Sequence, residues 1–92
     1  MVIQASVLVL PTAFCVGKQT RDLLFNANIV ITHIRRSDKD YAKMDNFGDK
    51  VIKAGDEITF IIQTYNIEDT RRHLEAFVGH QDDFSYDVLQ QK

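Results

Sequence analysis

The sequence is poor in the features that mark several large classes of protein. It has a single cysteine, Cys15, so no disulfide can form within the chain, and we expect a reducing, cytoplasmic setting. Its apolar runs, of which the segment 7–10 is typical, are far shorter than the roughly 18–20 residues that cross a bilayer. No positively charged segment precedes that run, which argues against a secretory signal peptide.

The chain is also short and nearly balanced in charge. Its 92 residues are enough for one domain, and 26% of them are charged. A formal net charge of −2 lacks the basic excess that proteins use to bind nucleic acid. A chain of this length buries only about 60–65% of its unfolded surface. A lone monomer would therefore be marginally stable, and dimerisation is one common remedy.

The clearest element is a strand over residues 57–63, which follows two Gly-Asp pairs at positions 48–49 and 55–56. Ile58, Phe60 and Ile62 alternate with polar residues, which is the period of a half-buried strand. Each Gly-Asp pair indicates a turn, because glycine accepts a positive φ and aspartate bonds to nearby backbone.

Two helices and three further strands are predicted. The segment 18–26 has a buried side of leucines, and Asn66 is a natural N-cap for a helix that stops at Gly79. Apolar residues predict a strand over residues 6–10 and a second over 28–35, in which Ile29 and Ile31 face one way and Val30 and Ile34 the other. A polar turn at 37–40 leads to a weaker strand near 41–44.

The expected architecture is α+β, a small mixed β-sheet with two helices in the order β-α-β-β-β-α. It occupies a domain over residues 4–79. Residues 80–92 form a C-terminal tail that is either an added strand or a segment ordered by a partner, because apolar residues alternate at 84, 86 and 88.

Catalytic and metal-binding patterns are weak, so we predict that the protein is not an enzyme. Gly17-Lys18 lacks the upstream glycine and the following Ser or Thr of a phosphate-binding loop. No histidine is placed beside Cys15, which is more simply a buried or half-buried thiol. The three histidines have no zinc-ligand spacing, and no metal site is predicted.

Two basic groups remain as candidate anion sites. The first is His33, Arg35 and Arg36 at the end of a strand, and the second is 71–73 on the last helix. Either group could hold a phosphate or carboxylate. The favoured alternative is that these residues form surface ion pairs with neighbouring carboxylates such as Glu57.

Three segments together resemble the TrkA-C domain, the C-terminal part of the RCK regulatory module of ion channels and transporters. They are Gly17-Lys18 with Asp22-Leu23, the branched strand 29–36 that ends in Ile34-Arg35-Arg36, and the double Gly-Asp segment 48–58. The order and spacing of these segments carry the resemblance, which covers about residues 4–78.

The resemblance implies a cytosolic regulatory, ligand-sensing domain on the cytoplasmic face of a potassium or other cation transporter, or of a chloride channel. Such domains form homodimers and gate the transporter when a ligand binds near the dimer interface. In some members the ligand is cyclic di-AMP, a cyclic dinucleotide. By position, Asn28, Ile29 and Val30 correspond to the ligand contacts, and Arg21 is the nearest candidate for the phosphate-binding arginine.

Two other functions stay open at this point. The domain could be a purely structural dimerisation module with no ligand of its own. It could instead be the sensor domain of a transcription regulator, in which a fused domain, and not this one, contacts nucleic acid.

Overall fold

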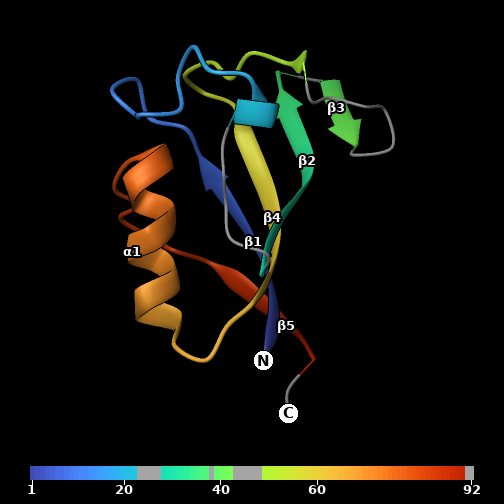
Figure 1. Ribbon diagram of the computed structural model, residues 1–92, viewed down its shortest axis with the longest axis vertical. Coiled ribbons are helices and arrows are strands. Elements are labelled where there is room, and N and C mark those ends of the chain that lie inside the picture. Colours follow the sequence, from blue (N-terminus) through green and yellow to red (C-terminus); the bar gives the residue numbers. More distant parts are fainter. Residues whose placement is uncertain (23–27, 38, 43–48, 91–92) are drawn as a thin grey trace.

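The computed structural model describes residues 1–22, 28–37, 39–42 and 49–90 (Figure 1). Its core is one five-stranded sheet with the strand order β3-β2-β4-β1-β5. Every pair of neighbouring strands is antiparallel, so the prediction of a mixed sheet was wrong, although the α+β class is confirmed. The strands are β1 (Val2–Leu8), β2 (Ile29–Arg36), β3 (Lys39–Ala42), β4 (Glu57–Gln63) and β5 (Tyr86–Gln90).

One α-helix, α1 (Ile67–Val78), lies in the described part of the chain, where two helices were predicted. Within the predicted first helix, residues 20–22 form a single 3-10 turn, Thr20–Asp22, and 23–27 lie outside the described residues. The backbone of Gly17-Lys18 bonds instead to Ile52, with N···O distances of 2.8 and 2.9 Å. That pairing ties residues 17–18 to the segment around Ile52, with Gly17 at a positive φ of 85°, and the helical turn begins only at Thr20.

The boundaries of α1 match the sequence prediction. The side-chain oxygen of Asn66 accepts hydrogen bonds from the N–H groups of Glu68 and Asp69, at 3.0 and 3.3 Å. Gly79 ends the helix with φ of 93°, and an added Cβ there would lie 2.8 Å from Cδ1 of Leu10. Glycine is therefore required both by the backbone and by the close approach of the first loop.

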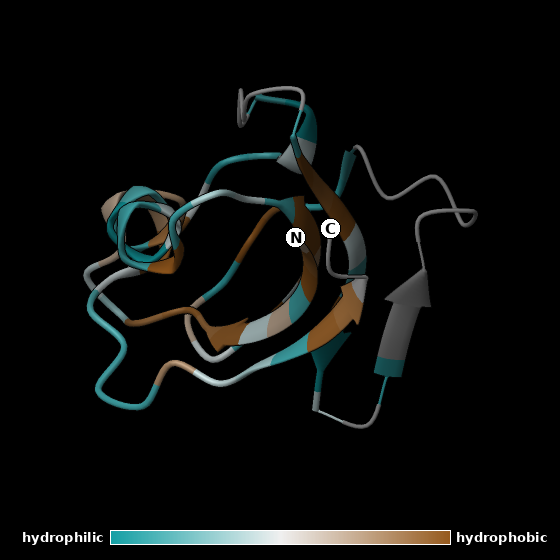
Figure 2. Cartoon of the chain, turned by 90° about the horizontal axis from the view of Figure 1, so that it is seen from below, coloured by the Kyte–Doolittle hydropathy of each residue, from teal (hydrophilic) through white to brown (hydrophobic). Residues whose placement is uncertain are grey.

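The helix covers one face of the sheet and buries the alternating apolar residues of the strands (Figures 1 and 2). Ile58, Phe60 and Ile62 of β4 are almost fully buried, as predicted, together with Leu74 and Val78 of α1. β1 begins earlier than expected, at Val2, because the polar residues at positions 4 and 6 belong to the uncovered face and do not interrupt the strand.

A β-bulge in β2 corrects the predicted facing of its residues. The register with β4 shifts between Ile31 and His33, so Ile34 returns to the same face as Ile29 and Ile31. A strand without the bulge would place Ile34 on the opposite side, as the strict alternation of the sequence predicted. All three isoleucines therefore pack into the core, and Val30 is on the uncovered face.

The C-terminal segment contributes β5, which pairs with β1 at the edge of the sheet. Of the two alternatives for residues 80–92, the added strand is the one seen. The returning strand near 41–44 is β3, whose described residues end at Ala42. No helix in the described residues is long and apolar enough to cross a membrane.

Candidate functional site

A cleft of about 330 Å³ opens between the start of β2, the end of β4 and the first turns of α1. Polar and apolar surface line it about equally. Its described lining residues are Asn28, Ile29, Ile62, Gln63, Thr64, Tyr65, Asn66, Asp69, Thr70 and His73. This volume lies at the lower end of the range of small-molecule sites, roughly 300–1,000 Å³.

Hydrogen bonds of Thr64 fix the geometry of this cleft. The Thr64 hydroxyl donates to the carbonyl oxygen of Asn66 at 3.0 Å and accepts from the Asn66 N–H at 3.1 Å. It also lies 2.6 Å from the hydroxyl of Thr70. Because the one proton of Thr64 goes to Asn66, Thr70 is the donor in that last bond. The end of β4 and the first turn of α1 are thereby held together.

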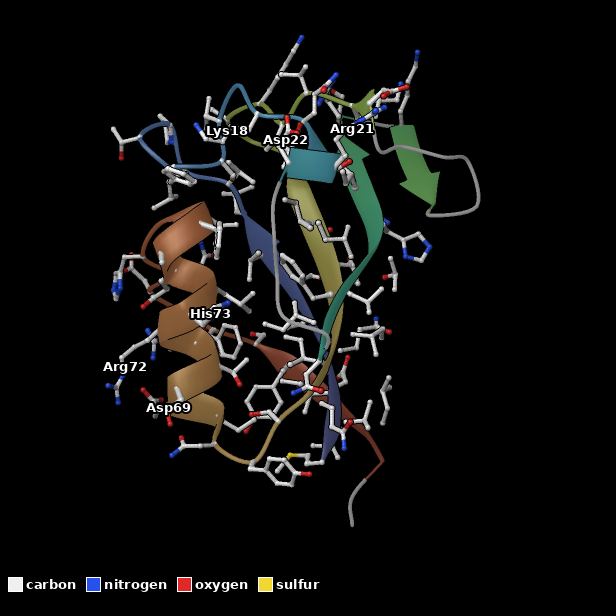
Figure 3. The ribbon with its side chains drawn as sticks, viewed as in Figure 1. Lys18, Arg21, Asp22, Asp69, Arg72 and His73 are labelled. Carbon is white, nitrogen blue, oxygen red and sulfur yellow. The ribbon has the colours of Figure 1, made fainter. Side chains whose placement is uncertain are left out.

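The few charged groups around the cleft give it no preference for an anion. Asp69 is the single carboxylate among the described lining residues, and none of them is a lysine or arginine. Asp69 lies 3.7 Å from Arg72, an exposed pair on the outside of the helix (Figure 3). The His73 ring packs against Phe77 with ring centroids 5.6 Å apart. The helix N-terminus offers a modest attraction for anions, which the carboxylate of Asp69 offsets.

The structure separates the four residues expected to bind a ligand. Asn28 and Ile29 line the cleft. Val30 pairs with Ile61 on the other face of the sheet. Arg21 lies beyond the far end of β2, where it forms an ion pair with Asp49. The length of β2 therefore lies between Arg21 and the cleft.

The face of the sheet away from the helix is called here the open face. The strand residues that alternate with the core residues point to this face, and they are exposed or half-buried. A hollow of about 250 Å³ on it is lined by Gln4, Ser6, His33, Arg35, Glu57 and Thr59. Ser6 and Thr59 hydrogen-bond across strands at 2.9 Å, and Arg35 lies 3.9 Å from Glu57.

The predicted basic group at the end of β2 is divided between two environments. His33 and Arg35 are on the open face, whereas Arg36 forms an ion pair with the buried carboxylate of Asp56. On α1, Arg71 and Arg72 are within 4 Å of the carboxylates of Glu75 and Asp69. The surface ion pairs favoured by the sequence are therefore confirmed for Arg35, Arg71 and Arg72, but not for Arg36, whose partner Asp56 is buried.

The pair of Arg36 and Asp56 is the feature that the sequence analysis missed. Asp56 is 1% exposed, and both its oxygens accept from Arg36 at 2.8 Å, while Oδ2 also accepts from the Lys53 N–H at 2.9 Å. Burial alone raises the pKa of Asp56, but these hydrogen bonds and the nearby positive charge outweigh it, so the pKa lies below its ordinary value. Gly55-Asp56 had been assigned only to a turn.

The remaining candidates for chemistry were Cys15 and a possible metal site. Cys15 is fully buried, as expected, and burial raises the pKa of its thiol. Among the side chains that the structure describes, no group of three or more His, Cys, Asp or Glu could hold a metal ion.

No protein-family model matches the chain. Comparison with curated proteins finds no significant relative.

Proposed function

We propose that this protein is a regulatory, ligand-sensing domain of an ion channel or transporter, which acts as a homodimer at the cytoplasmic side of the membrane. The proposal draws on the resemblance to TrkA-C domains. Its main structural support is the cleft beside Asn28 and Ile29, the position where that resemblance expects a ligand. The domain does no chemistry in this view and acts by binding.

Regulation would follow because ligand binding is thermodynamically coupled to the conformation of the domain. The cleft is formed by β2 and β4 on one side and by α1 on the other, so a bound molecule contacts both layers. A ligand that binds one conformation more tightly shifts the open–closed equilibrium of the gate toward the state that this conformation favours. The size of the shift is set by the difference in affinity, typically about 1–3 kcal/mol of coupling. The chemistry of the lining narrows the ligand: with Asp69 present and no lysine or arginine described, a neutral or cationic hydrogen-bonding group fits better than a phosphate.

Titration calorimetry with a small panel tests the proposal. The panel is cyclic di-AMP as the anionic probe, adenosine as the neutral probe and spermidine as the cationic probe. Asn28→Ala should weaken the binding of the active probe about fivefold to tenfold, the effect of one lost hydrogen bond. Asp69→Asn should weaken a cationic probe and tighten an anionic one, whereas Asp22→Asn, on an exposed turn away from the cleft, is the matched control.

A purely structural dimerisation module is the second candidate, because the open face leaves one side of the sheet uncovered by the described residues. A dimer in sedimentation equilibrium that binds no probe would support that candidate over ligand sensing. A chain that binds no probe and sediments as a monomer at high concentration would contradict both.

A further inference from the structure

The strand β5 presents an open edge. It is the last strand of the sheet and pairs with β1 through Ala5↔Tyr86, Gln4↔Asp87 and Ile3↔Val88. No described strand lies on its other side. An edge strand carries backbone N–H and C=O groups that can pair with another extended chain. Only one residue of this strand, Asp87, is charged, and the strand contains no proline or lysine; its one protective feature is a register shift between the pairs of Val88 and Gln90.

The two sides of β5 differ in chemistry. Residues opposite each other in an antiparallel pair point to the same face. Tyr86 and Val88 therefore lie on the side of the core, opposite Ala5 and Ile3, yet 41% and 49% of their surfaces are exposed. Asp87 lies opposite Gln4 on the open face and is exposed, and the exposed Leu89 follows at the register shift between the pairs of Val88 and Gln90. The core side of the sheet thus continues past β1 as a partly exposed apolar margin, in which the rings of Phe84 and Tyr86 lie 5.9 Å apart.

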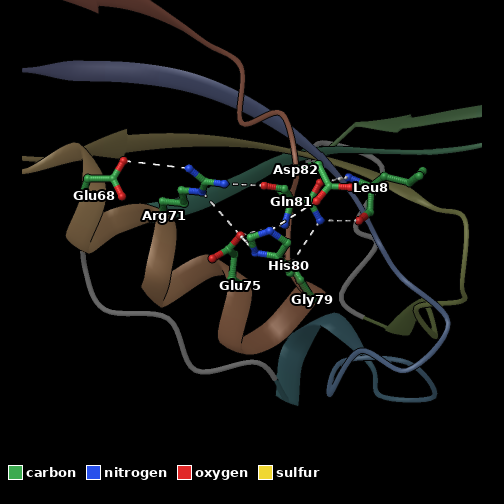
Figure 4. A network of polar contacts seen from close by, with 8 residues as sticks. All are labelled: Leu8, Glu68, Arg71, Glu75, Gly79, His80, Gln81 and Asp82. Carbon is green, nitrogen blue, oxygen red and sulfur yellow. Dashed lines mark hydrogen bonds and ion pairs between the residues drawn. The ribbon is translucent and has the colours of Figure 1, made fainter.

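A network of polar contacts fixes the path of the chain into β5 (Figure 4). The Gln81 side chain donates to the carbonyl oxygen of Leu8 at 2.8 Å and accepts from the Leu8 N–H at 3.3 Å, as a strand residue would. Its backbone N–H binds Glu75 at 2.7 Å, and its carbonyl oxygen accepts from Arg71 at 2.6 Å. His80 lies 2.9 Å from Glu75. These bonds set the edge in place before any partner binds, which lowers the cost of ordering it.

The surroundings of β5 are acidic. Residues 80–90 include three aspartates, Asp82, Asp83 and Asp87, and no lysine or arginine. Arg71, whose guanidinium donates to the carbonyl oxygen of Gln81, is already engaged by Glu75. A partner that brings positive charge is therefore favoured over an acidic one.

From these features we propose that the β5 edge binds an extended segment of a partner protein in which apolar and basic residues alternate. The segment adds a sixth strand beside β5. Its apolar side chains extend the margin of Tyr86 and Val88, and its basic side chains lie on the open-face side, next to Asp87. The period of two follows from strand geometry, because successive residues point to opposite faces.

Fluorescence anisotropy of the full chain with a short, end-capped, labelled peptide of alternating lysine and valine tests this proposal. We expect saturable binding, and hydrogen exchange should slow at the backbone amides of β5. Asp87→Lys should weaken binding about threefold to tenfold, because an exposed attraction becomes a repulsion. The control Asp22→Lys makes the same change of net charge at the opposite end of the sheet and should alter binding by less than about twofold.

Two control peptides, used with the unmodified protein, make the test independent of how well any variant folds. A peptide with N-methylated backbone amides cannot pair with β5 and should bind at least about tenfold more weakly, because several backbone hydrogen bonds are lost. A peptide with glutamate in place of lysine should also lose affinity. The proposal is overturned by equal binding of the N-methylated peptide, by absence of binding, or by a dimer of the free chain whose β5 amides are already protected.

Discussion

Replacement of Asp56 by asparagine tests the energetic role of the buried ion pair. Asparagine keeps the shape of the side chain but places an NH₂ group where one carboxylate oxygen now accepts from Arg36 or Lys53. Breaking a buried pair by removing one partner typically costs about 3–5 kcal/mol. The Arg36 side chain is 30% exposed and can recover some hydration, so we expect a loss of about 2–3 kcal/mol.

That loss is large for a domain of this size. At roughly 0.05–0.15 kcal/mol per residue, the whole chain is stable by about 5–14 kcal/mol. The midpoint of urea unfolding should fall with an unchanged m-value, and Tm should fall by about 10–20 °C. The control is Asp49→Asn, the aspartate of the other Gly-Asp pair, which is 70% exposed and should cost less than about 1 kcal/mol.

The pH dependence of the same pair has a definite sign. Because the folded-state pKa of Asp56 is lowered, its contribution to stability is fully present above the unfolded pKa of about 3.9 and is lost as the pH falls through the folded value. The difference in stability between the wild type and Asp56→Asn should therefore shrink below about pH 4. The ion-pair account fails if Asp56→Asn costs no more than Asp49→Asn, or if the difference is independent of pH.

Two further substitutions test the core and the helix boundary. Phe60→Ala should cost about 3–5 kcal/mol in urea unfolding, because Phe60 is fully buried at the centre of β4, and a cost below about 1 kcal/mol would mean that its side chain is not in the core. Asn66→Ala should cost about 1 kcal/mol by removing the side-chain oxygen that caps α1, whereas Asn66→Asp, which keeps that oxygen, should restore most of the stability lost in Asn66→Ala.

Local chemistry was enough to predict the elements whose signals lie within a few residues. The alternation in β4 identified the buried face correctly, and Asn66 and Gly79 marked both ends of α1. A cap, a turn or a period of two depends on neighbours in the chain, so the sequence contains the whole signal. For the same reason the class of fold, α+β, could be predicted.

The candidate cleft was predictable in part. Asn28 and Ile29 were chosen through a resemblance, and both line it. The lining residues of α1, such as Thr70 and His73, were not chosen, because their positions depend on how the helix packs across the end of the sheet. Arg21 is close to Asn28 in the sequence, but in the structure it lies beyond the end of β2 that is far from the cleft.

The sequence by itself determined the buried face of β4 and both ends of α1, because these follow from the period of the strand and from the capping residues. Tertiary structure alone decided which distant residues meet. The bulge that returns Ile34 to the core, the pairing of Arg36 with Asp56 and the bonding of Gln81 to Leu8 join residues up to 73 positions apart. Such contacts depend on strand order and register, which are set by the packing of the whole sheet against α1 and have no local signal.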